Sequence, residues 1–118
     1  MMPPRTVLDP ETPRHPFETC SFLWGDRNYL LHHPVQVLSA HQDGLWVFEC
    51  PAYGLSAFAA DRDEAFAHLR EEFAFLYEGL NGEADDALTR DAIALRDRLR
   101  TDVQNESRVE IRGTLPMI

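Results

Sequence analysis

Hydrophobic and polar positions follow a strand period in the middle of the chain. Residues 34–41 and 45–50 are rich in β-forming side chains, and residues 42–44 between them have the composition of a tight turn. This pattern predicts a β-hairpin. Residues 51–54 then break the pattern with proline and glycine, and residues 55–60 predict a third strand.

The flanking segments show weaker strand patterns. Residues 19–24 are apolar and end at a Gly-Asp pair, which predicts a short strand. Residues 27–33 fit either a further strand or a turn. Residues 108–111 are a last strand-like stretch, and we expect them to add to the edge of the sheet.

A helical period replaces the strand period after residue 60. Asp61 or Asp63 can cap the first turn, because a short acidic side chain accepts hydrogen bonds from the free amides there. At 100° per residue the apolar side chains fall in one sector about 120° wide, and Asn81 and Gly82 are typical of a helix end. Residues 88–103 repeat a narrower apolar stripe, which predicts a second helix. The apolar positions are Ala65, Phe66, Leu69, Phe73, Leu76, Tyr77 and Leu80 in the first helix and Leu88, Ala92, Leu95, Leu99 and Val103 in the second.

These elements together predict an α+β fold. We expect a small antiparallel sheet of three to four strands, packed by one long amphipathic helix and followed by a second helix. Five of the eight prolines fall within the first 16 residues, which predicts a proline-rich N-terminal arm over residues 1–17. Residues 18–113 then form a single α+β domain, and residues 114–118 form a C-terminal tail.

The charge balance narrows the class of partner. The 118 residues include 20 acidic groups against 11 arginines, with no lysine, for a formal net charge of −9. Without a basic surface to neutralise phosphates, we expect no direct nucleic-acid partner. The absence of lysine also excludes Schiff-base and Walker-type chemistry. Most of the acidity lies in residues 61–86, on and just after the first helix.

The compartment follows from what the sequence does not contain. There is no run of about 18 apolar residues to span a membrane, and the proline-rich start does not resemble a secretory signal. We therefore expect a cytoplasmic protein without a membrane partner. In such a protein Cys20 and Cys50 are expected to be free thiols.

The sequence contains none of the common catalytic or metal-binding motifs. The sequence has no spaced Cys/His metal motif, no nucleophile motif and no glycine-rich phosphate loop. We therefore assign no catalytic, cofactor-binding or metal-ligating residue and favour a non-enzymatic protein.

Two chemical alternatives stay open. Glu49, Asp61 and Asp63 lie at strand ends and at the helix start, where a nuclease or hydrolase can gather carboxylates around a divalent metal. The two aspartates are equally explained by helix capping. A small-molecule pocket lined by Trp46, Phe48 and Phe58 is a further possibility.

The outer face of the first helix is the most informative surface. Five side chains lie close together opposite the apolar sector, with one large aromatic ring among three acids. One interpretation is that the second helix or the N-terminal arm covers this ring. The other is an interaction face, in which the ring anchors a basic partner and the acids steer it. The five residues are Glu64, His68, Glu71, Phe75 and Glu78.

The order of hairpin, break, short strand and acid-capped helix resembles the HicB-like antitoxin domain, a partial RNase H-like fold. The likeness covers residues 35–80 and depends on residues 43–47, 51–54 and 61–65. It implies a sheet with a helix on one face, assembly into dimers or larger, no catalysis, and binding of a small basic RNase toxin. This chain departs from the family in a shorter loop at residues 51–54, in its proline-rich arm and in lacking a DNA-binding module after Gly82. We therefore expect either a basic protein partner or self-association.

Overall fold

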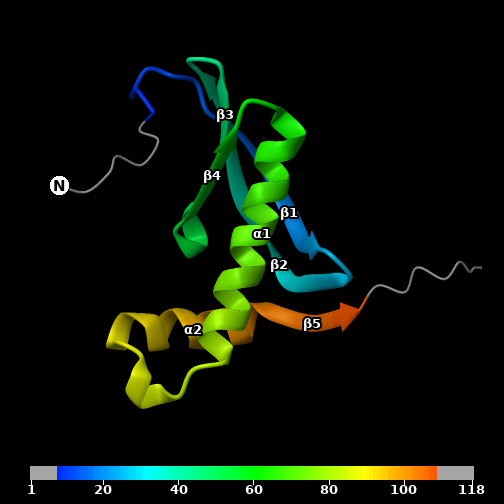
Figure 1. Ribbon diagram of the computed structural model, residues 1–118, viewed down its shortest axis with the longest axis vertical. Coiled ribbons are helices and arrows are strands. Elements are labelled where there is room, and N and C mark those ends of the chain that lie inside the picture. The colour runs from blue at the N-terminus through cyan, green and yellow to red at the C-terminus, as the bar shows by residue number, and fades with distance from the viewer. Residues whose placement is uncertain (1–7, 109–118) are drawn as a thin grey trace, which may run out of the picture.

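A computed structural model describes residues 8–108 and has the expected α+β architecture. An antiparallel sheet has the strand order β1-β2-β3-β4, and β5 also pairs with β2 (Figure 1). The strands are β1 His15–Trp24, β2 Arg27–Gln42, β3 Leu45–Cys50, β4 Leu55–Ala59 and β5 Val103–Arg108; the helices are α1 Arg62–Asn81 and α2 Arg90–Asp102, with short 3-10 turns η1 Pro51–Tyr53 and η2 Asp85–Ala87.

The predicted hairpin is formed by β2 and β3. Asp43 and Gly44 connect the strands with φ angles of 54° and 78°. Two consecutive positive φ values match the right-handed twist of a hairpin, and Asp-Gly is a pair that adopts them readily. In the register that follows, His41 lies opposite Trp46, and β4 pairs along the other side of β3.

The first two strands are longer than the sequence pattern predicts. Residues 27–33 and 34–41 form one continuous strand, β2, because β1 pairs along both of its halves. Pro34 is tolerated inside β2 because the proline lies between the part that pairs with β5 and the part that pairs with β3. β1 begins at His15, opposite Ser39, so the last residues of the expected arm belong to the sheet.

The C-terminal strand also differs from the prediction. α2 ends at Asp102 and β5 starts at Val103, a residue expected in the helical stripe. Val103 lies opposite Leu31 of β2, and this pairing ends the helix earlier than its apolar period alone would. Within the expected strand at residues 108–111 only Arg108 is described. Residues 1–7 of the arm and the 114–118 tail lie outside the described residues.

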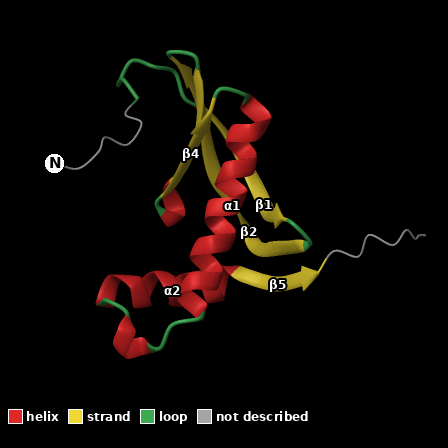
Figure 2. Ribbon diagram, in the orientation of Figure 1, coloured by secondary structure: helices red, strands yellow, loops and turns green. Residues whose placement is uncertain are grey.

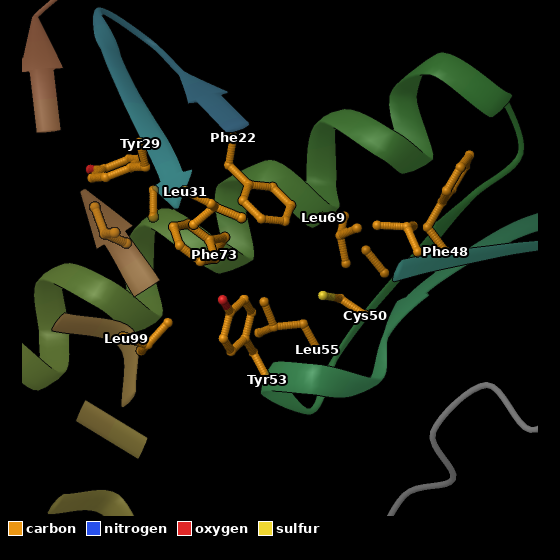
Figure 3. Packing of buried hydrophobic residues seen from close by; sticks show 14 of the residues in the cluster. Phe22, Tyr29, Leu31, Phe48, Cys50, Tyr53, Leu55, Leu69, Phe73 and Leu99 are labelled. Carbon is orange, nitrogen blue, oxygen red and sulfur yellow. The ribbon is translucent and has the colours of Figure 1, made fainter. Parts of the chain in front are cut away.

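α1 lies across one face of the sheet, and α2 crosses α1 near the C-terminal end of α1 (Figures 1 and 2). The predicted apolar sector of α1 faces the sheet, with Ala65, Leu69 and Phe73 fully buried. Aromatic side chains fill the space between the layers: the Phe73 ring stacks on Phe22 with ring centroids 4.3 Å apart (Figure 3). Neither helix in the described part of the chain has the length and apolar content to cross a membrane.

The N-terminal segment packs on the sheet face opposite α1. Leu8 is buried there with Ala40 and Val47 in a small cluster separate from the main core. The Gln42 side-chain oxygen accepts from the Asp9 amide and from the Thr12 hydroxyl. These contacts tie the described end of the N-terminal segment to the tip of the β2–β3 hairpin.

Candidate functional site

The five residues predicted to bind a partner are all on α1, and the cap of α1 sets where their stripe begins. The Asp61 side chain accepts from the backbone amide of Glu64 at 3.0 Å, so Asp61, and not Asp63, is the N-cap. Along the helix from this cap, four of the five side chains are exposed and one is half-buried. The exposed ones are Glu64, His68, Phe75 and Glu78, and the half-buried one is Glu71.

Phe75 is the most exposed large apolar residue in the described part of the chain. Its side chain keeps 60% of its surface accessible, so α2 does not cover it. Its ring meets the edge of Trp24, with centroids 6.3 Å apart and planes at 82°. Trp24 is itself 36% exposed. The two rings therefore form an exposed aromatic pair that joins α1 to the end of β1.

Glu78 has a structural role that the helical spacing did not reveal. Its carboxylate accepts from the hydroxyl of buried Tyr29 at 2.9 Å and forms an ion pair with Arg27 at 3.0 Å. Both donors come from the start of β2. Glu78 therefore ties α1 to the sheet, and its carboxylate is engaged within the protein.

A groove runs between α1 and the edge strand β4. Its helix side is lined by His68, Glu71 and Glu72, and its strand side by residues 56–58. The Nδ1 atom of His68 lies 3.4 Å from the carbonyl oxygen of Phe58. The N-terminal half of the predicted stripe therefore borders a strand edge and is not an isolated helical surface.

A second groove lies on the other side of α1. Trp24, Arg27 and Tyr29 line it from the β1–β2 turn, and Ala74, Phe75 and Glu78 line it from the helix. The exposed aromatic pair stands at this groove. Sequence reasoning missed Trp24, because a helical wheel shows which residues share a face but not which strands lie beside that face. It missed Glu72 because, at 100° per residue, Glu72 lies about 80° around the helix from Glu64 and so falls outside the narrow stripe.

Two arginines of α1, Arg62 and Arg70, lie over aromatic rings, and Arg62 also lies 3.9 Å from Asp63. The Arg62 guanidinium lies 5.8 Å from the Trp46 ring centre and 5.6 Å from that of Phe48. Arg70 lies 4.8 Å from the ring centre of Phe66. Cation–π contacts of this kind hold the guanidinium groups over the core aromatics. Within the described part of the chain, neither arginine forms an ion pair with the glutamates of the outer face of α1.

The carboxylates of the metal hypothesis do not come together. Glu49 lies opposite Ser56, near the start of β4, whereas Asp61 and Asp63 follow the end of that strand. The strand from Ser56 to Ala59 alone spans about 10 Å. Among residues 8–108 no group of three or more His, Cys, Asp or Glu side chains is arranged to hold a metal ion.

The three aromatic residues of the pocket hypothesis lie on different faces of the sheet. Phe48 is buried in the main core beneath α1. Val47, next to Phe48 in β3, points to the opposite face and packs there with Leu8. Phe58 lies opposite Val47 in the β3–β4 pair, so the Phe58 side chain is also on the face away from α1. Trp46, two residues from Phe48, is on the α1 side. The three rings therefore do not line one pocket.

No protein-family model matches this chain, and the searches of curated proteins and of solved structures return no significant match. The fold and the site define it as an α+β protein with an open antiparallel sheet and an acidic, aromatic-bearing helix face.

Proposed function

We propose that this chain is a non-enzymatic interaction domain that binds a basic protein through the outer face of α1. The observation that carries the proposal is the exposed pair of Phe75 and Trp24 beside an acidic helix. Exposed aromatic rings are the usual anchors of protein interfaces, and charges around them accelerate and orient association.

The glutamates on the outer face of α1 that have no partner within the described structure favour a basic binding partner. Glu64, Glu71 and Glu72 are on the outer face of α1, as His68 and Phe75 are, and form no ion pair with another side chain in the described structure. A patch that combines one apolar anchor with several unneutralised carboxylates suits an arginine- or lysine-rich surface.

By its resemblance to the HicB-like antitoxin domain, the proposal extends to an antitoxin-like role in which the partner is a small basic RNase. Both cysteines are free thiols, which fits the reducing cytoplasm expected for such a pair. Self-association is the competing proposal, and two chains of net charge −9 would repel each other unless other contacts offset the repulsion.

Co-expression tests this function. The tagged chain is produced together with the product of each neighbouring reading frame, and bound protein is measured after affinity purification. We expect a small basic product to be retained in stoichiometric amount and to be lost with Phe75→Glu. Leu23→Glu is the matched control, because Leu23 is 47% exposed and, by strand alternation with Trp24, points to the opposite face of the sheet.

Two outcomes would overturn the proposal. Retention of the basic product by Phe75→Glu at the wild-type level would show that the α1 face is not the interface. If no neighbouring product binds, and light scattering of the purified chain shows a dimer that Phe75→Glu dissociates, self-association replaces the basic partner.

A further inference from the structure

The free edge of β4 is a second feature beside the acidic face of α1. β4 is the last strand in the order β1-β2-β3-β4, and no strand of residues 8–108 pairs with its outer edge. We propose that an extended segment of the basic partner adds to β4 as an additional strand. This inference rests on the proposed function for the basic character of the partner.

The backbone groups at this edge point toward the groove. The carbonyl oxygen of Phe58 lies 3.4 Å from Nδ1 of His68 on α1 and is therefore directed away from β3. In an antiparallel pair the amide and carbonyl of one residue point the same way, and alternate residues behave alike. Ser56 and Phe58 thus direct their amides and carbonyls away from β3, and an incoming strand would replace the His68 contact at the Phe58 carbonyl.

The two outer strands of the sheet differ in how they resist such pairing. β1 contains Pro16 and Glu18, and its pairing with β2 shifts register between Thr19 and Ser21. Prolines, charges and irregular register are the usual features that prevent edge-to-edge association. β4, with the sequence Leu-Ser-Ala-Phe-Ala, has none of them. Within residues 8–108 the β4 edge is protected by its short length and by the contact between His68 and the Phe58 carbonyl.

The side chains beside β4 define the added segment. On the α1 side, β4 has Leu55 in the main core followed by the small residues Ala57 and Ala59, and the groove is bordered there by Glu71 and Glu72. On the opposite face Phe58 is 49% exposed. Because successive side chains of a strand alternate between faces, the segment that fits has basic residues toward α1 and apolar residues beside Phe58.

A second copy of this chain fits the edge less well. Two β4 strands paired about a two-fold axis would bring together the Glu49, Glu71 and Glu72 side chains of both copies, since these residues line the grooves at this edge. Like charges facing each other oppose association. The charge at the edge therefore favours a basic segment from another protein.

A peptide-binding experiment tests the inference. The probe is a short fluorescent peptide of alternating arginine and valine, titrated against the full chain and followed by anisotropy; an alternating glutamate and valine peptide is the control. We expect saturable binding of the basic peptide only. Ser56→Pro removes the outward amide and should weaken binding by at least about tenfold. Ser56→Thr keeps the amide and should bind as the wild type does.

Hydrogen exchange provides a readout that does not depend on the folding of the proline variant. The basic peptide should slow exchange of the Ser56 and Phe58 amides in the wild-type chain. Binding without such protection, equal binding by a folded Ser56→Pro variant, or failure of the basic peptide to bind would each overturn the inference. If Ser56→Pro retains the basic product of the co-expression test and Phe75→Glu loses it, the proposed function stands and the strand addition fails.

Discussion

The hydroxyl of Tyr53 donates to the carboxylate of Asp102 at 2.8 Å and joins residues 49 positions apart in the sequence. Tyr53 ends the η1 turn between β3 and β4, and Asp102 is the last residue of α2. Arg98 adds to the contact: its guanidinium lies 5.5 Å from the centre of the Tyr53 ring, and it donates to the Ala52 carbonyl. This cluster fixes α2 against the core.

Removing the Tyr53 hydroxyl should destabilise the fold. We expect Tyr53→Phe to lower the free energy of unfolding by about 1 to 3 kcal/mol, because a hydrogen bond to a charged group is lost. Urea denaturation measures the change. Asp102→Ala should have a similar effect, and the double variant should lose less than the sum of the two. Simple additivity would show that the two groups do not interact energetically.

Alkaline pH should weaken the same contact. Burial, and then the hydrogen bond to Asp102, raise the pKa of Tyr53 above its ordinary value of 10.0. Burial likewise raises the pKa of the Cys50 thiol above 9.0. Both groups therefore favour folding while protonated, and this stabilisation declines as the pH rises above the pKa values of the unfolded chain. We expect urea stability to fall between about pH 9 and pH 11, and to fall less steeply in Tyr53→Phe. Equal slopes would contradict the assignment to Tyr53.

The two cysteines should differ in reactivity. Cys20 is exposed on β1, whereas Cys50 is fully buried and its pKa is raised by that burial. Because the thiolate is the reactive form, a thiol reagent should modify Cys20 in the native protein and both residues in urea. Mass spectrometry after brief iodoacetamide treatment gives the site of labelling. Rapid native labelling of Cys50 would mean that the core opens around η1.

Phe73 and Phe75 lie on opposite sides of α1, two residues apart, and should respond differently to truncation. Phe73 is fully buried, and its ring packs against Phe22, Tyr29 and Tyr53. Phe73→Ala should cost about 3 to 5 kcal/mol of stability, because it leaves a cavity in the core. Phe75→Ala should cost less than about 1 kcal/mol, since the Phe75 ring touches only the edge of Trp24 among the described aromatic rings. Thermal denaturation measures both variants. Similar decreases in melting temperature for Phe73→Ala and Phe75→Ala would show that the two rings do not differ in their contribution to stability.

The fold class and the local elements were predictable because short-range chemistry determines them. Asp43 and Gly44 set the hairpin, Asp61 caps α1, and the apolar sector that includes Leu69 is buried as expected. β1 and β2 were predicted too short, because their extent depends on pairing with each other. The end of α2 was misplaced for a similar reason, since Val103 pairs with Leu31.

The candidate site, like the fold, was predictable from the sequence only in its local part. The sequence by itself determined that α1 has an acidic outer stripe with Phe75 in it, because a helix period places residues on a face without reference to the rest of the chain. Only the tertiary structure decided that Trp24 lies beside Phe75 and that the β4 edge borders the stripe. It also decided that Tyr29 and Arg27 bind the Glu78 carboxylate. These contacts depend on strand order and register, which are set by pairings between distant segments and have no local pattern of their own.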